Sequence, residues 1–181
     1  MKKSYLTAVL LCLLALTVNA QKLLPPKIDK MTGDTTLKTS EERIFTSLSW
    51  TGGETDILYT YAAKYKGSKF LVFHINVTNG KRSSVFAVSK GSKAFLKIAN
   101  GSIIELTAGT SEISESQVFS GTFGANTRGD AYPIFELTKE LEEKFKGVSV
   151  VMVRIETTNG NMDFEIKEKK ATIISKEIEL I

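Results

Sequence analysis

The chain contains one histidine, His74, and one cysteine, Cys12. Any Ser-His-Asp arrangement would therefore have to use His74, because that chemistry needs an imidazole base. The sequence contains no Gly-x-Ser-x-Gly elbow, glycine-rich phosphate loop, His-Glu-x-x-His pair or calcium-binding loop. A glycosidase needs only two carboxylates, a requirement without a sequence pattern. A small hydrolase with paired carboxylates thus stays open, and no metal or cofactor is indicated.

Rings that carry a polar atom alternate along two neighbouring segments. They are Tyr59, Tyr61, Tyr65 and His74. We expect residues 57–65 and 69–77 to pair through a turn near Lys66-Gly67-Ser68, which places the four rings on one face and an aliphatic set on the other. The aliphatic face is the better core candidate. The ring face suits stacking against sugars or peptides, provided that each ring is at least about a quarter exposed. The alternative is that the rings, and His74 in particular, are buried and structural.

Three further residues are candidates for ligand contact. Trp50 precedes Thr51-Gly52-Gly53, and so large a ring either contacts a partner or fills the core. Arg128 and Asp130 enclose Gly129 in the glycine-rich stretch from Gly121 to Asp130. We expect this stretch to be a loop because glycine and asparagine tolerate turn conformations. Arg-Gly-Asp is an integrin-binding tripeptide, and a plain surface turn is the alternative interpretation.

Residues 1–20 are typical of a secretory signal peptide. Lys2 and Lys3 precede an apolar run from Leu6 to Val18, and cleavage is expected after Ala20. Cys12 lies inside the apolar run and follows a leucine, whereas a lipoprotein processing site would have a small residue there. The mature chain is therefore expected to contain no cysteine and no disulfide.

The mature chain is expected to comprise an extended lead-in, residues 21–30, and a single domain, residues 31–181. The whole sequence has 24 Lys and Arg and 20 Asp and Glu. Two of the lysines lie in the leader, so 22 basic and 20 acidic residues remain. They alternate, whereas a nucleic-acid binder gathers basic residues on one face, so we expect no nucleic-acid partner. No second apolar run approaches the roughly 20 residues that span a membrane.

The composition of the domain predicts an antiparallel β protein. Runs rich in Val, Ile, Phe, Tyr and Thr are separated by turn residues. Asn-Gly occurs at residues 79–80, 100–101 and 159–160. We expect each to be a two-residue hairpin loop, since both residues tolerate positive φ. In the last hairpin this loop would place Ile155 opposite Phe164 and Val153 opposite Ile166, giving one apolar and one charged face.

Two helices are expected beside the strands. Leu137, Leu141 and Phe145 recur every four residues, between a suitable amino-terminal cap, Thr138, and a closing glycine, Gly147. A second helical stripe ends the chain, at Ala171, Ile174, Ile178 and Ile181. The predicted fold class is mainly β: an antiparallel two-sheet sandwich or a partly open barrel with one or two flanking helices.

Several short motifs are shared with one group of exported proteins. The domain opens with Asp29-Lys30-Met31-Thr32-Gly33-Asp34-Thr35-Thr36 and Thr39-Ser40, and the likeness continues through Leu96-Lys97, Asn100-Gly101, Leu106, Tyr132-Pro133, Leu137, Leu141 and Arg154-Ile155-Glu156-Thr157. In these motifs the chain resembles a recurrent, uncharacterised type of exported protein from Bacteroidetes. The resemblance implies a periplasmic or surface β protein without an established activity, and it assigns no site residues.

The function expected from the sequence is that of a non-catalytic binding or interaction module in the bacterial cell envelope. Its ligand would be a glycan, a peptide or an envelope protein, bound by the ring face or by the stretch from 121 to 130. The alternatives are the small hydrolase and a structural subunit that pairs through its sheet edges. The identity of the ligand and the oligomeric state are left open by the sequence.

Overall fold

A computed structural model describes residues 21–48, 54–79, 85–121 and 124–181. Their main element is an eight-stranded antiparallel sheet, here called the large sheet, with strand order β1-β2-β4-β5-β11-β10, β3 paired with β4 and β12 paired with β5. Its strands are β1 (Lys27–Ile28), β2 (Thr35–Lys38), β3 (Glu42–Leu48), β4 (Thr55–Tyr65), β5 (Ser68–Asn79), β10 (Glu115–Gly121), β11 (Gly124–Ala131) and β12 (Ile134–Leu137).

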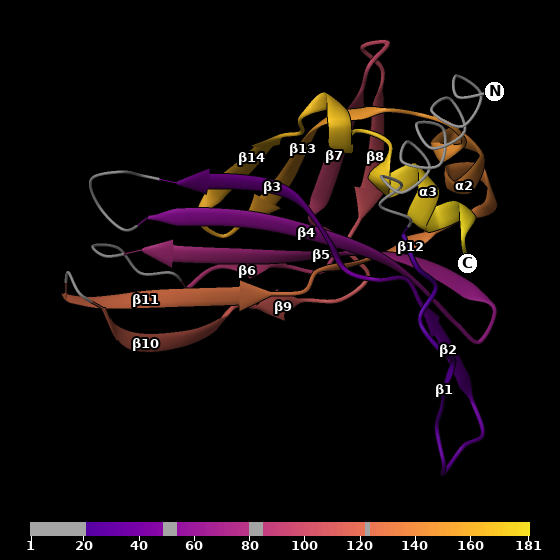
Figure 1. Ribbon diagram of the computed structural model, residues 1–181, viewed down its shortest axis with the longest axis horizontal. Coiled ribbons are helices and arrows are strands. Elements are labelled where there is room, and N and C mark those ends of the chain that lie inside the picture. Colours follow the sequence, from indigo (N-terminus) through magenta and orange to yellow (C-terminus); the bar gives the residue numbers. More distant parts are fainter. Residues whose placement is uncertain (1–20, 49–53, 80–84, 122–123) are drawn as a thin grey trace, which may run out of the picture.

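A second, four-stranded sheet lies against the large sheet, and its strands cross those of the large sheet (Figure 1). Its order is β14-β13-β7-β8, with β7 (Lys93–Ile98), β8 (Ile103–Thr107), β13 (Val150–Thr157) and β14 (Gly160–Glu165). A short pair, β6 (Ala87–Val88) and β9 (Glu112–Ile113), completes the described strands. Crossed sheets that share a core are one of the standard ways to pack β layers. The predicted mainly antiparallel β fold class is confirmed.

The hairpin of β4 and β5 forms around the predicted turn and has the predicted faces. Tyr65 pairs with Ser68, and the loop is Lys66-Gly67. Both loop residues have positive φ, 49° for Lys66 and 86° for Gly67, as the type I′ loop that matches strand twist requires. The predicted core face of the hairpin is buried at Leu58, Ala62, Leu71, Phe73 and Ile75, and Val77, at its end, is partly buried against the core.

The core lies between this aliphatic face and the four-stranded sheet. Both sheets contribute to one cluster of buried side chains. Phe164 of β14 is 1% exposed, and its ring meets that of Phe45 of β3 edge-on, with the ring centres 5.3 Å apart. This contact joins the two sheets at β3.

The hairpin of β13 and β14 has the predicted faces but not the predicted pairs. Val153, not Ile155, pairs with Phe164. The loop consists of residues 158–159, because only Gly160 has positive φ, at 102°. When a hairpin loop moves by one residue along the chain, each residue pairs with a partner two positions from the predicted one. Because strand faces alternate with a period of two, each side chain stays on its predicted face. The apolar face is therefore buried despite the wrong pairing.

The other predicted Asn-Gly loops also differ from expectation. The turn at residues 100–101 does join β7 to β8, but with three loop residues. Ile98 N–H donates to Ser102 O at 2.9 Å, and Gly101 has a φ of 89°. A turn followed by a glycine in the left-handed region is the usual three-residue solution. In the 79–80 pair, Gly80 lies outside the described residues, as does Trp50, so these two predictions stay predictions.

The stretch from Gly121 to Asp130 is not the predicted loop. Residues 124–130 form most of β11, which pairs with β10 on one side and β5 on the other. The backbone of β11 thus has hydrogen-bond partners on both sides, and this outweighs the low strand propensity of its glycines. Arg128 and Asp130 are strand residues that face the same side of the sheet.

The helices lie where the sequence predicts them. Thr138 Oγ1 accepts from Leu141 N–H at 3.3 Å and caps α2 (Lys139–Phe145), and Lys69 of β5 pairs with Glu142 at 2.9 Å. A 3₁₀ turn, η2 (Glu168–Lys170), precedes the terminal helix α3 (Ile173–Glu179). Of the predicted apolar stripe, Ala171, Ile174 and Ile178 are buried, and Ile181 packs partly buried against the core.

The predicted lead-in is extended and hydrogen-bonded to the domain. Leu24 N–H donates to Lys38 O at 2.8 Å, and β1 pairs with β2. The side chain of Gln21 donates from Nε2 to Ile173 O at 2.9 Å. The β1–β2 hairpin projects from the rest of the molecule (Figure 1).

Helix α3 carries a buried acid against the large sheet. Glu177 is 0% exposed, and its Oε2 accepts from Thr60 Oγ1 at 3.1 Å. Its other carboxyl oxygen has no hydrogen-bond partner among the described residues. Burial, with the nearby Glu42 and Glu41 charges, raises the pKa of Glu177 well above 4.5. The site of Glu177 therefore favours the neutral, protonated form of this acid over the ionised form.

Replacing Phe164 by alanine should lower the free energy of unfolding by roughly 3 to 5 kcal/mol, because a buried ring leaves a cavity between the sheets. Urea denaturation of Phe164→Ala measures the loss. Asn161→Ala, an exposed change on the same strand, is the control and should stay close to the parent. Equal midpoints for the two variants would contradict the proposed role of the ring in joining the sheets.

Replacing Glu177 by glutamine should stabilise the protein increasingly as the pH rises. A raised pKa means that the folded state binds this proton more tightly than the unfolded chain does. The free energy of unfolding of the parent therefore falls as the pH rises above 4.5 toward the folded-state pKa, and glutamine removes this loss. Denaturation midpoints across a pH series test this. Glu168→Gln, at an exposed acid, should leave the pH dependence unchanged; a Glu177→Gln profile parallel to the parent would refute the prediction.

Candidate functional site

Three stacked rings stand in a row across the face of the large sheet that points away from the core. Tyr59 of β4 is the register partner of His74 of β5. Tyr132, between β11 and β12, lies on the other side of His74, because Phe73 N–H donates to Pro133 O at 3.2 Å. The imidazole centre is 5.0 Å from the Tyr59 ring and 4.3 Å from the Tyr132 ring, and each pair is inclined by 18°. We call these residues the ring row.

Each nitrogen of the central imidazole meets a carboxylate. His74 Nδ1 contacts Glu41 Oε1, and His74 Nε2 lies 2.9 Å from Asp130 Oδ1. A neutral imidazole has a single N–H and donates to one of these acids, whereas the doubly protonated ring donates to both. The two carboxylates and the two tyrosines thus fix the position of the imidazole on four sides.

Asp130 gathers three donors of the ring face. Besides His74, it accepts from Asn76 Nδ2 at 2.5 Å and from Arg128 Nε at 2.9 Å. Burial alone would raise the pKa of Asp130, but the hydrogen bonds from these three residues outweigh it and lower the pKa below 3.8. Asp130 is consequently an ionised acceptor whose geometry is determined by three partners.

The remaining predicted ring residues lie on the same face, outside the ring row. The ammonium of Lys38 lies 3.5 Å from the centre of the Tyr61 ring, so one face of this ring is already occupied by a cation. Burial, with the Glu41 charge, raises the pKa of Tyr61 to about 12. Tyr65, at the hairpin end, donates from its hydroxyl to Asp34 Oδ2 at 3.1 Å.

The exposure of these rings corrects the predicted platform. His74 is 8% exposed, below the quarter that direct recognition by the imidazole would require. It is covered by its neighbours on the same face, and no described side chain of this face belongs to the core cluster. Tyr132 is 40% exposed and the side chain of Arg128 is 46% exposed. The solvent-accessible residues of the cluster are thus Tyr132 and Arg128. The buried His74 ring stacks against Tyr132.

Three members of the cluster, Tyr132, Asn76 and Glu41, were not singled out as site residues by the sequence. Asn76 lies two residues after His74 on β5 and therefore on the same face. Tyr132 follows Asp130 by two residues, and recognition of a strand there would have placed both on one face. No pattern in the sequence identifies Glu41 as a partner of His74. It lies beside β3, two strands away from His74, and its carboxylate reaches the imidazole across β4.

The cluster has no metal-binding geometry. The two carboxylates lie at opposite edges of the imidazole and use both of its nitrogens, so the three groups do not converge on one point. Over the described residues as a whole, no group of three or more His, Cys, Asp or Glu side chains is arranged to hold an ion.

Comparisons with protein-family models, with curated proteins and with solved structures gave no match to this chain. Among the described helices, none is both long enough and apolar enough to cross a membrane. The class that the fold and the cluster define is therefore a mainly antiparallel β protein with a polar, ring-lined sheet face.

Replacing Asp130 by asparagine should lower the free energy of unfolding by about 1 to 3 kcal/mol, because three donors lose a charged acceptor in a half-buried position. Chemical denaturation measures the change. Glu115→Gln is the matched control, since Glu115 is the exposed register partner of Asp130 on β10. If the two variants unfolded at the same denaturant concentration, Asp130 would not organise the cluster.

Proposed function

We propose that this chain is a non-catalytic binding module of the bacterial cell envelope, and that its ligand is a glycan bound at Tyr132. The observation that carries the proposal is the ring row held between two carboxylates on a sheet face that lies outside the core. Such a cluster is rigid before a ligand arrives, and preorganisation lowers the entropic cost of binding.

The accessible groups around Tyr132 match the chemistry of a sugar. One ring face of Tyr132 stacks on His74, and the ring as a whole is 40% exposed. Arg128 supplies N–H donors on the same face, and the exposed carboxylate of Glu115, on the paired strand β10, supplies acceptors. Flat rings stack against the C–H faces of pyranoses, while paired donors and acceptors satisfy hydroxyl groups.

Catalysis is less well supported than binding at this site. A general base needs a ring nitrogen within reach of the substrate, and both nitrogens of His74 face carboxylates. A carboxylate pair needs a substrate bond between its members. Here the imidazole occupies the space between Glu41 and Asp130.

A second candidate function rests on the edge of the large sheet. Strand β10 is the last strand in the sheet order, and Val118 on it is 73% exposed. Ile113, on the preceding β9, is 68% exposed. An edge strand with exposed apolar side chains is suited to pairing with a strand of a partner, which would make the chain a structural subunit.

The proposed location rests on residues 1–20, whose charged start, short apolar run and small residues before position 21 are those of a signal peptide. The motif resemblance to exported Bacteroidetes proteins points the same way. Periplasm and outer surface are both compatible with these features.

The proposal predicts that Tyr132→Ala weakens glycan binding by roughly 1 to 3 kcal/mol, the usual value of an aromatic stacking contact, with little change in stability. An array of bacterial and host oligosaccharides identifies the tightest binder, and isothermal titration calorimetry with that oligosaccharide measures the affinities of parent and variant.

Ile103→Ala is the control, because Ile103 is a similarly exposed side chain in the four-stranded sheet. Loss of binding in Tyr132→Ala alone supports the proposed site. An array without any specific binder, or equal affinities for the two variants, would reject glycan binding at Tyr132.

A further inference from the structure

A groove rich in basic residues runs between β3 and the segment from β14 to α3, away from the ring row. It consists of two adjoining hollows of about 310 and 380 Å³ that share Arg43, Lys169 and Lys170. Lys167 lines the first hollow and Lys176 the second. We call these five cations the basic groove. Its size is that of a small-molecule site.

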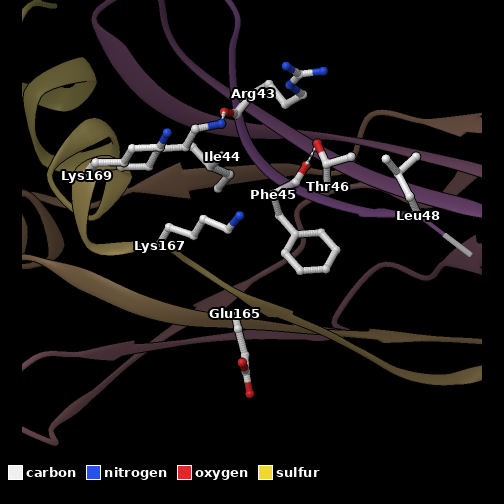
Figure 2. A pocket seen from close by; sticks show the side chains of 9 residues that line it. Arg43, Ile44, Phe45, Thr46, Leu48, Glu165, Lys167 and Lys169 are labelled. Carbon is white, nitrogen blue, oxygen red and sulfur yellow. Dashed lines mark hydrogen bonds between the residues drawn. The ribbon is translucent and has the colours of Figure 1, made fainter.

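The cations of the basic groove are not neutralised within the described residues. None of the five forms an ion pair there, although lysines elsewhere in the described part do. Glu165 lines the first hollow, but its side chain points away from Lys167 and Lys169 (Figure 2). Glu42, in the second hollow, accepts from Ser40 Oγ at 3.0 Å.

Lys170 is affected by the neighbouring positive charges of the basic groove. Lys170 is partly buried, and its ammonium donates to the carbonyl oxygen of Arg43. Burial, and then the charges of Arg43, Lys169 and Lys167, outweigh the opposing charge of Glu42 and lower the pKa of Lys170. Like charges held together in this way repel one another, and an anion among them would relieve the repulsion.

We propose that the basic groove is a binding site for a phosphoryl group, carried by a lipid headgroup or by a soluble phosphorylated compound. Three features support a phosphoryl ligand over a single carboxylate. The groove gathers five cations, a phosphate monoester carries up to two negative charges and three acceptor oxygens, and the N–H donors of these cations come from β3, from the segment before α3 and from α3.

The two sources of the phosphoryl group differ in what lies beside it. Phe45 and Leu48 form an apolar end of the first hollow, and Leu48 is 69% exposed. A lipid would place its chains along this end, whereas a soluble phosphorylated compound would use the cations alone. The basic groove and the ring row lie on different elements of the fold. The proposed phosphoryl site is therefore independent of the proposed glycan function.

The experiment measures binding of the purified protein to two probes. The first is inorganic phosphate, followed by calorimetry. The second is vesicles of phosphatidylcholine with a minor fraction of phosphatidic acid, compared with pure phosphatidylcholine in a sedimentation assay. The test variant is Lys167→Gln with Lys169→Gln, because both side chains are exposed and neither holds the fold together. We expect it to weaken binding to at least one probe about tenfold or more.

The control is Lys144→Gln with Lys146→Gln on α2, which removes the same charge from another surface. Loss of binding only in the groove variant supports the proposal. The probe whose binding is lost identifies the source of the phosphoryl group. Equal losses in both double variants would show attraction by net charge alone and overturn it. Failure of the parent to bind either probe would overturn it as well.

Discussion

The pairing of β4 with β5 is the constraint on which the other features depend. Its type I′ loop at Lys66-Gly67 determines which residues of the two long strands face the core. A slip of one residue would turn the aliphatic face outward and bury the polar rings. The core, which needs Leu71 and Phe73 inside, and the ring row, which needs Tyr59 and His74 outside, are thus two consequences of one register.

Features that depend on strand alternation could be predicted from the sequence. Alternation has a period of two, so the faces of β13 and β14 are correct even though the loop was misplaced by one residue and Phe164 pairs with Val153. Loop positions are harder to predict because one glycine at positive φ suffices for a turn. At residues 159–160 the glycine alone has this conformation, and the asparagine before it does not.

The partners of His74 could not be predicted, because they come from distant segments. Glu41 is 33 positions away and Asp130 is 56 positions away. Asp130 was assigned to a loop because glycines favour turns, but a strand between two others obtains hydrogen bonds on both sides regardless of its composition. The basic groove could not be predicted for the same reason. Its cations come from β3, from the segment before α3 and from α3 itself, and β3 is far in sequence from the other two.

The segment from 41 to 45 connects these surfaces. Glu41 reaches His74 on the outer face, while Ile44, the residue after Arg43 in the bulged part of β3, is buried in the core. Arg43 lines the basic groove, and Phe45 packs on Phe164. A bulge lets neighbouring residues face directions that a regular strand would not allow. One short irregular segment therefore serves the ring row, the core and the groove, so the spacing between the two candidate sites is set by the packing of β3 and cannot vary freely.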